Sequence, residues 1–254
     1  MRKKYIVANW KMNPLEVGDA EKLFKKIKDK APRFKNVRII ICPPHVYLGE
    51  LTYVYSGNKI QFGAQDCFWE NKGPFTGETS PYQIKDLGAD FVILGHSERR
   101  AQGETNEIVN KKVKAALSVG LSVILCVGEK KRDESGEHLQ FIKDEIIESL
   151  KSVSKEKLNN IVVAYEPIWA IGGDDRNAMT AKDLHEMKLF VLKILRGVYG
   201  PRGMEVPIIY GGSSAPENAE ELIKEGEVDG LLVGHESLMA EHFLEIINIA
   251  DRIK

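Results

Sequence analysis

Short apolar runs recur along the whole chain, and most of them are continuous rather than alternating with polar residues. Many are rich in Val and Ile, which is typical of strands that are buried on both faces, as in a parallel sheet. We therefore predict strands at residues 5–8, 37–42, 60–64, 91–94, 123–127, 161–165, 207–210 and 230–233.

The segments between these runs are longer and carry apolar residues at the spacing of an amphipathic helix. Two of them begin with the pattern of a capping box, one at Thr180 with Asp183 and one at Ser214 with Glu217. The apolar stripes that predict buried helix faces are Leu184, Met187, Val191, Ile194, Leu195 and Val198 in one helix, and Ile142, Ile146, Ile147 and Leu150 in another.

Strand-like runs that each precede a helical segment indicate repeated βα units and an α/β fold. Right-handed crossovers permit either a doubly wound sheet or a closed eight-stranded barrel, and periodicity does not separate these two architectures. Eight units in 254 residues favour the barrel. No long linker rich in Gly, Ser or Pro divides the chain, so residues 1–254 are expected to form a single domain.

Composition and charge narrow the class of partner. The 36 basic residues balance 37 acidic ones, so the net charge of -1 provides no basic surface for nucleic acid. No apolar run has the length of a membrane span or of a signal peptide, and the three cysteines lack the spacing of a disulfide or metal framework. We expect a cytoplasmic protein with reduced thiols and with neither a nucleic-acid nor a membrane partner.

Candidate chemical groups fall just after predicted strands, at the end of a barrel where active sites are built. Glu166 is followed by Pro167 and by an apolar segment with a glycine pair, which is how a lid over a substrate can be hinged. His96 opens a helical turn whose N–H groups favour a neutral imidazole, and Lys11 can offer a fixed cation to an anion. Taken alone, Glu166 is also consistent with a surface carboxylate, His96 with a structural histidine and Lys11 with a solvated lysine.

Two glycine-containing loops, at residues 210–214 and 233–237, follow the last two predicted strands. Glycine lets backbone N–H groups approach an anion closely, and the start of a helix adds a favourable dipole. Barrel enzymes often bind phosphate with the loops after strands seven and eight. The two loops together therefore predict a phosphate site.

These segments form a series of motifs from the first predicted strand to the last: Asn9-Trp10-Lys11-Met12-Asn13, Gly63-Ala64-Gln65, Phe75-Thr76-Gly77-Glu78, Gly95-His96-Ser97-Glu98-Arg99-Arg100, Cys126-Val127-Gly128-Glu129, Ala164-Tyr165-Glu166-Pro167-Ile168-Trp169-Ala170-Ile171-Gly172, Tyr210-Gly211-Gly212-Ser213 and Asp229-Gly230-Leu231-Leu232-Val233-Gly234. In order and spacing, the series resembles the triosephosphate isomerase family.

The resemblance implies a single-domain (β/α)8 TIM barrel that interconverts dihydroxyacetone phosphate and D-glyceraldehyde 3-phosphate, a reaction of glycolysis and gluconeogenesis, without cofactor or metal. By the same resemblance, Glu166 carries the proton between two carbons, and His96 is a neutral electrophile toward the enediolate. Lys11 supplies positive charge and Asn9 orients the site. Supporting roles fall to Glu98 and Cys126, and phosphate contacts to Gly172, Ser213, Gly234 and the N–H of His235.

The resemblance also implies a homodimer in which the loop around residues 75–78 inserts beside the active site of the partner subunit. Thr76, Glu78 and Arg99 are then expected at the dimer interface. Because such a loop would complete the neighbouring site, the isolated subunit is expected to be a poor catalyst.

Two departures from the family pattern stand out. The lid usually continues as Thr-Gly-Lys, whereas here residues 173–177 carry two aspartates and Arg176, so we expect altered lid opening with catalysis retained. His235 stands where a second glycine is commoner, which is tolerated if only its N–H is used and its φ is compatible. Two alternatives remain open: an isomerase of a four-carbon ketose phosphate, and a non-catalytic phosphate-binding barrel, against which the presence of Lys11, His96 and Glu166 argues.

Overall fold

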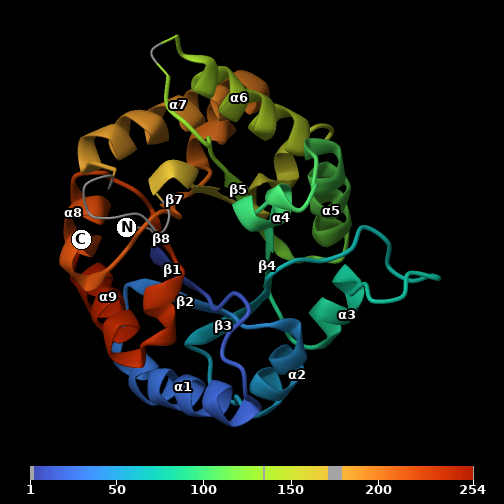
Figure 1. Ribbon diagram of the computed structural model, residues 1–254, viewed down its shortest axis with the longest axis vertical. Helices are drawn as coiled ribbons and strands as arrows, with labels where there is room; N and C mark the ends of the chain where they lie inside the picture. Colours follow the sequence, from blue (N-terminus) through green and yellow to red (C-terminus); the bar gives the residue numbers. More distant parts are fainter. Residues whose placement is uncertain (1–2, 134, 171–178, 254) are drawn as a thin grey trace.

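The computed structural model describes residues 3–133, 135–170 and 179–253. Within them, eight parallel strands pair in sequence order, and the last strand pairs with the first, so the sheet closes into a barrel (Figure 1). The predicted barrel is confirmed and the doubly wound alternative is wrong. The strands are β1 Lys4–Asn9, β2 Val37–Cys42, β3 Ile60–Ala64, β4 Phe91–Leu94, β5 Ser122–Val127, β6 Ile161–Tyr165, β7 Ile208–Tyr210 and β8 Gly230–Val233.

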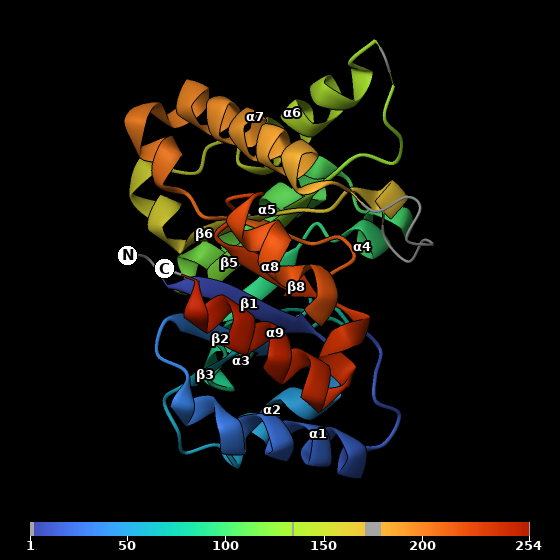
Figure 2. The ribbon, with the colours of Figure 1, turned by 90° about the vertical axis from the view of Figure 1, so that its left-hand side faces the viewer.

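Helices form a ring around these strands, as the two views show (Figures 1 and 2). No helix among the described residues is both long and apolar enough to cross a bilayer. The α-helices are α1 Val17–Lys30, α2 His45–Tyr53, α3 Pro81–Asp86, α4 Ser97–Ala101, α5 Asn106–Ser118, α6 Glu137–Ser149, α7 Ala181–Tyr199, α8 Pro216–Lys224 and α9 Ala240–Arg252, and short 3-10 segments include Ile168–Ala170, Gly200–Glu205 and His235–Leu238.

The continuous apolar runs arise because both faces of each strand are buried. In β1, Tyr5 and Val7 belong to the cluster inside the barrel, whereas Ile6 and Ala8 pack outward in the layer beneath the helices. Ile40 repeats the inward orientation in β2. Each fully buried aliphatic side chain of this kind contributes about 1.5–3 kcal/mol, so the two layers together hold the strand ends in fixed positions.

Two of the predicted buried residues are exposed. Val198 is 45% exposed in the last turn of α7, where Tyr199 is buried instead and its hydroxyl donates to the carbonyl of Leu150 at 3.0 Å. Ile147 is 37% exposed because Ile146, one residue earlier, faces the core. Adjacent helical residues point about 100° apart, so two consecutive isoleucines do not both face the barrel.

The predicted helix starts have different outcomes. The N-cap at Thr180 is confirmed, since its hydroxyl accepts from the backbone N–H of Asp183 at 3.1 Å. The predicted cap at Ser214 is wrong, because α8 begins one residue later and its cap position is Ala215. Asn218 satisfies the N–H of Ala215 at 2.9 Å, while the Ser214 hydroxyl donates to the carbonyl of Gly212.

Barrel closure depends on a glycine at the start of β8. Gly230 pairs with Tyr5 of β1, and a Cβ atom built on Gly230 would lie 1.9 Å from the Tyr5 carbonyl oxygen. No side chain fits in that space, so glycine is required where the first and last strands meet.

The loop between β3 and α3 projects away from the ring of helices (Figure 1). Residues 70–78 in this loop are exposed, and aromatic contacts at its base join Phe68 to Trp69 and to Phe75. Thr76 and Glu78, expected at a dimer interface, therefore lie in an exposed, projecting loop whose base is packed.

Candidate active site

A cavity of about 350 Å³ at the carboxyl end of the barrel gathers residues from distant parts of the chain. Its volume lies within the range of small-molecule sites. The predicted site residues that line it lie at the end of β1 or shortly after β1, β4, β6, β7 and β8; they are Asn9, Lys11, His96, Glu166, Ser213, Gly234 and His235.

His96 occupies the N-cap position of α4, directly after the turn that ends β4. Its Nδ1 accepts a hydrogen bond from the backbone N–H of Glu98 at 3.2 Å. A ring nitrogen that accepts carries no proton, so the contact assigns the neutral tautomer with its proton on Nε2. That Nε2 lies 3.3 Å from Oε1 of Glu166, at the edge of the cavity.

Glu166 is 2% exposed and sits against the beginning of α4. Its Oε2 accepts from the backbone N–H of Ser97 at 3.1 Å, while the main chain of Glu166 donates to the carbonyl of Val127 at 2.8 Å. The carboxylate is thus held by one N–H of α4 and faces the imidazole carried by the same helix. Sequence reasoning missed Ser97, because its backbone rather than its side chain makes the contact.

Glycines on both sides make room for Glu166. A Cβ atom at Gly211 would lie 2.7 Å from Cγ of Glu166, and one at Gly128 would lie 1.8 Å from its carbonyl oxygen. The glycine after β7 therefore accommodates the carboxylate in addition to being available to an anion, a second role that sequence reasoning did not predict.

Lys11 is fixed by three neighbours. Its φ of 53° lies in the left-handed region, which is uncommon for residues other than glycine. The side chain of Asn9 accepts from the N–H of Lys11 at 3.1 Å, and the amide of Gln65 donates to its carbonyl at 2.8 Å. The ammonium pairs with Glu98 at 2.5 Å, so Asn9 and Glu98 both support Lys11 directly.

Cys126 is fully buried in β5, beside the carboxylate of Glu166. Burial raises the pKa of its thiol well above the usual value, and the negative charge of Glu166 adds to that rise. The thiol therefore stays neutral next to the carboxylate. Cys42 and Cys67 are likewise buried and free.

A second buried carboxylate, Glu129, anchors the segment that follows Glu166. It accepts from the hydroxyl of Tyr165 at 2.9 Å and from the indole N–H of Trp169 at 2.8 Å. The guanidinium of Arg132 lies 5.2 Å from the centre of a Trp169 ring and 3.5 Å from Glu129. Sequence reasoning placed Glu129 at a strand end but did not find Arg132, which lacks any motif context.

The residues expected to bind phosphate are brought together only in part. Ser213, Gly234 and His235 line the same cavity as Lys11. The side chain of His235 is exposed and its φ is not positive, so a residue other than glycine is tolerated there. Gly172 and the unusual lid residues 173–177 lie outside the described residues.

Arg99 was expected near a dimer interface, and the structure ties it into its own subunit. Its guanidinium forms ion pairs of 3.0 Å with Asp66 and 3.0 Å with Glu104, and the buried Lys112 contacts the same two carboxylates. This cluster holds the base of the projecting loop. A second hollow of about 420 Å³ lies between that loop and Lys11.

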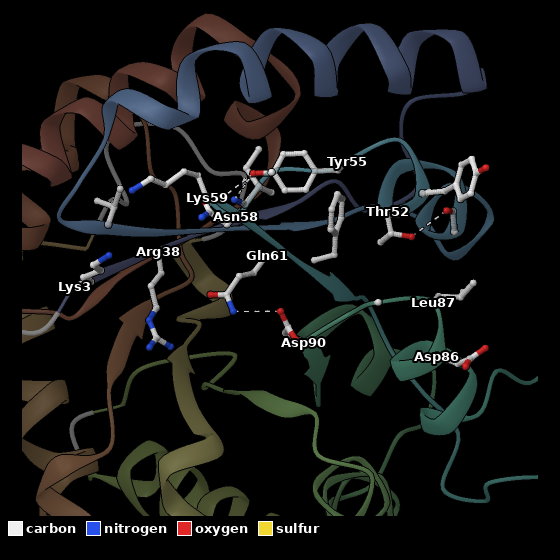
Figure 3. Close-up of a pocket in the computed structure, with 17 residues that line it drawn as sticks. Lys3, Arg38, Thr52, Tyr55, Asn58, Lys59, Gln61, Asp86, Leu87 and Asp90 are labelled. Atoms are coloured by element: carbon white, nitrogen blue, oxygen red, sulfur yellow. Dashed lines mark hydrogen bonds between the residues drawn. The ribbon is translucent and has the colours of Figure 1, made fainter.

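A larger hollow of about 980 Å³ lies at the amino ends of β2, β3 and β4, away from His96 and Glu166 (Figure 3). Lys3, Arg38 and Lys59 lie toward one end of it, and Gln61 donates to Asp90 at 3.3 Å in its middle. Its lining contains no histidine and no cysteine, and the amino-terminal face of such barrels usually serves stability rather than catalysis.

Comparison with known proteins agrees with this geometry. The family model described as triosephosphate isomerase matches residues 4–250. A triosephosphate isomerase of Thermoanaerobacter pseudethanolicus is 44% identical over 253 residues, covering 98% of this chain and 100% of the relative. One from Dictyoglomus turgidum is 39% identical over 97% of this chain and 99% of the relative.

Among solved structures, the crystal structure of triosephosphate isomerase from Bartonella henselae is similar, with a TM-score of 0.84 and 33% identity. The similarity covers 97% of this chain and 98% of that one. The chain belongs to the triosephosphate isomerase family.

Proposed function

We propose that this chain interconverts dihydroxyacetone phosphate and D-glyceraldehyde 3-phosphate by moving a proton between adjacent carbons through an enediolate. The observation that carries the proposal is the pairing of a buried carboxylate with a neutral imidazole, His96 Nε2 being 3.3 Å from Glu166 Oε1, beside Lys11 in one cavity. An aldose–ketose isomerisation needs a base for carbon and an acid for oxygen, and these two groups supply both.

Glu166 acts as the base. Its carboxylate leaves the N–H of Ser97, takes the proton from the carbon next to the carbonyl and returns it to the neighbouring carbon. Gly211 packs against this side chain, and any larger residue there would clash with Cγ of Glu166. Its burial excludes water, which strengthens the electrostatic interactions of the reacting carboxylate.

His96 acts on the oxygens. With Nδ1 accepting from Glu98, its Nε2–H donates to the substrate carbonyl and stabilises the negative charge that develops there. Nε2 gives this proton to the former carbonyl oxygen and takes the hydroxyl proton from the neighbouring oxygen, so the imidazole ends neutral and the O–H bond has moved with the C–H bond. Lys11 adds a fixed positive charge, held in place by Asn9 and Glu98.

The phosphate is bound by backbone N–H groups of the last two loops, at Ser213, Gly234 and His235, with Gly172 completing the set. Support comes from the fact that these loops line the same cavity as Glu166 and Lys11. Backbone donors bind an anion without a counter-charge that would compete with catalysis.

We further propose that residues 1–254 work as one catalytic domain and as a homodimer in the cytoplasm. Large apolar side chains in or just after the loops that follow β1 and β2 support the dimer, since Met12, Leu15 and Val46 are 86%, 90% and 80% exposed. Phe75, on the projecting loop, is 40% exposed. Apolar groups concentrated on neighbouring loops are typical of an interaction surface.

A coupled assay with D-glyceraldehyde 3-phosphate tests the activity. The wild-type chain is expected to turn over the triose phosphate, and Glu166→Gln is expected to lower kcat about 10²–10⁴-fold, the usual contribution of a general base. Weak wild-type activity that rises with a four-carbon ketose phosphate would contradict the triose assignment. Equal activity in both proteins would contradict the role of Glu166.

A further inference from the structure

An ion pair lies behind the active site and has no part in the chemistry described above. Arg100 belongs to α4 and Glu145 to α6, and their facing atoms, Nε and Oε1, are 3.3 Å apart. The Glu145 side chain is 3% exposed and that of Arg100 is 14% exposed. A buried pair of this kind is costly to desolvate and adds little stability, so its geometric consequences are of interest.

The arginine contacts the turn that carries His96. Its Nε donates to the carbonyl of Gly95 at 2.7 Å, immediately before His96. One of its terminal nitrogens donates to Asn106 at 2.6 Å, so the planar guanidinium is held in one orientation. Arg100 thereby fixes the start of α4, where His96 is the N-cap and Ser97 supplies the N–H that holds Glu166.

The glutamate contacts the turn that supports Glu166. Oε2 of Glu145 accepts from the backbone N–H of Gly128 at 2.8 Å. Gly128 packs so closely against the main chain of Glu166 that no Cβ atom fits between them. The Glu145 carboxylate therefore accepts a hydrogen bond from Gly128, which packs against Glu166. The same carboxylate pairs with Arg100, which contacts the turn before His96.

We propose that Arg100 and Glu145 are positioning residues that set the distance between His96 and Glu166 across the end of β5. This inference rests on the proposed function, because it assigns the pair a role in the same proton transfer. The pair touches no reacting atom and acts only through Gly95 and Gly128. Errors of about 1 Å in such a constellation cost up to about 10²-fold in rate.

The charge on Glu145 makes the role measurable. Burial raises the pKa of Glu145 to about 7, against the lowering effects of Arg100 and of the Gly128 N–H. The carboxylates of Glu166 and Glu129 also face it and add to the rise. Near neutral pH the ion pair therefore forms as pH increases, and Glu145→Gln resembles the protonated state at every pH.

The experiment measures kcat and KM from pH 6 to pH 8.5 for the wild type, for Glu145→Gln and for a matched control, Asp144→Asn. Asp144 is the preceding residue of α6 and pairs only with Gln140 among the described residues. We expect the ratio of kcat in Glu145→Gln to kcat in the wild type to fall from about one half at pH 6 to about one tenth at pH 8.5. KM should change less than about twofold, and Asp144→Asn should follow the wild type.

A ratio of one at every pH would overturn the proposal, and so would a deficit that is independent of pH, which would indicate a static packing defect. Circular dichroism checks that each variant is folded. If Glu145→Gln does not fold, Arg100→Lys tests the proposal instead. An ammonium keeps the positive charge but lacks the planar guanidinium that contacts both Gly95 and Glu145. That variant should lower kcat with KM retained, and wild-type kcat would overturn the proposal. A wild type without triose isomerase activity would instead overturn the proposed function.

Discussion

The Nε2 atom of His96 lies 3.3 Å from Oε1 of Glu166, although the two residues follow strands that are separated in the barrel by β5. Their proximity results from the start of α4, which carries the imidazole and also donates the Ser97 N–H to the carboxylate. The proposed acid and the proposed base are therefore both positioned by the same short helix.

From this relationship we expect His96→Gln to lower kcat about 10²–10⁴-fold with a small change in KM, because a donor to the developing oxyanion is lost. Combined with Glu166→Gln, the loss should be much smaller than the product of the single effects, since groups that act as a unit are not additive. Steady-state kinetics of the three variants check this. Fully multiplicative losses would show that the two residues act independently.

Gly211→Ala should lower kcat about 10- to 100-fold, because its Cβ atom would lie 2.7 Å from Cγ of Glu166 and displace the base. The measurement is kcat at saturating substrate, with thermal unfolding to confirm that the fold is retained. Unchanged kcat would mean that the carboxylate has more room than the structure gives it.

Gly197→Ala in α7 is the matched glycine control. A Cβ atom there meets nothing within 4 Å, so the substitution should leave kcat unchanged. It should also stabilise the protein by about 0.4–1 kcal/mol, because alanine restricts the unfolded chain and favours the helix. Urea unfolding checks the gain, and a loss of stability would count against it.

Leu15→Asp should shift the protein toward monomers and lower kcat at least about tenfold, because it places a charge in the apolar surface proposed as the dimer interface. Sedimentation and activity, measured at the same protein concentration, check this. Tyr53→Asp is the control, since Tyr53 is 92% exposed and lines the hollow at the amino ends of the strands. A Leu15→Asp protein that remains dimeric would exclude this loop from the interface.

Stability should depend on pH through Glu145, whose pKa is raised from 4.5 to about 7 by burial. The folded state binds the proton more tightly, so this stabilising contribution is complete below about pH 4.5 and is lost as pH rises through about 7. Relative to Glu145→Gln, the wild type should lose about 1.4 kcal/mol per pH unit between those values and nothing further above them. Urea unfolding of both proteins at fixed concentration measures the difference, and parallel curves would refute it.

Much of the fold could be predicted from the sequence because the strands are buried on both faces. The runs at residues 37–42, 60–64 and 161–165 coincide with β2, β3 and β6, since each apolar run is bounded by polar residues or by proline, which limits where a buried strand begins and ends. Periodicity predicted the buried stripe of α7 but not where it stops. Val198 is exposed because Tyr199, the last residue of the helix, faces the core instead, and only tertiary packing decides between the two.

The residues that line the cavity were predictable from motifs at strand ends, but the interactions that hold them were not. Glu145 and Arg100 are far apart in sequence and lie on ordinary helical segments, so only the folded chain shows that they meet. The same holds for Gln65, whose amide bridges the carbonyls of Lys11 and Cys42. The helix cap predicted at Ser214 was wrong because the Ser214 hydroxyl hydrogen-bonds to the carbonyl of Gly212 in the loop. This bond competes with the capping role that the sequence pattern suggests.

The junction between Tyr5 and Gly230 also bears on synthesis. During translation β1 emerges first, yet one of its two neighbours in the sheet is the last strand to be made. Until then β1 presents an unpaired edge on that side, and the mouth of the barrel lacks the loop of Gly234. Completion of the sheet and of the proposed phosphate site therefore coincide, so a nascent or truncated chain without its final segment lacks both.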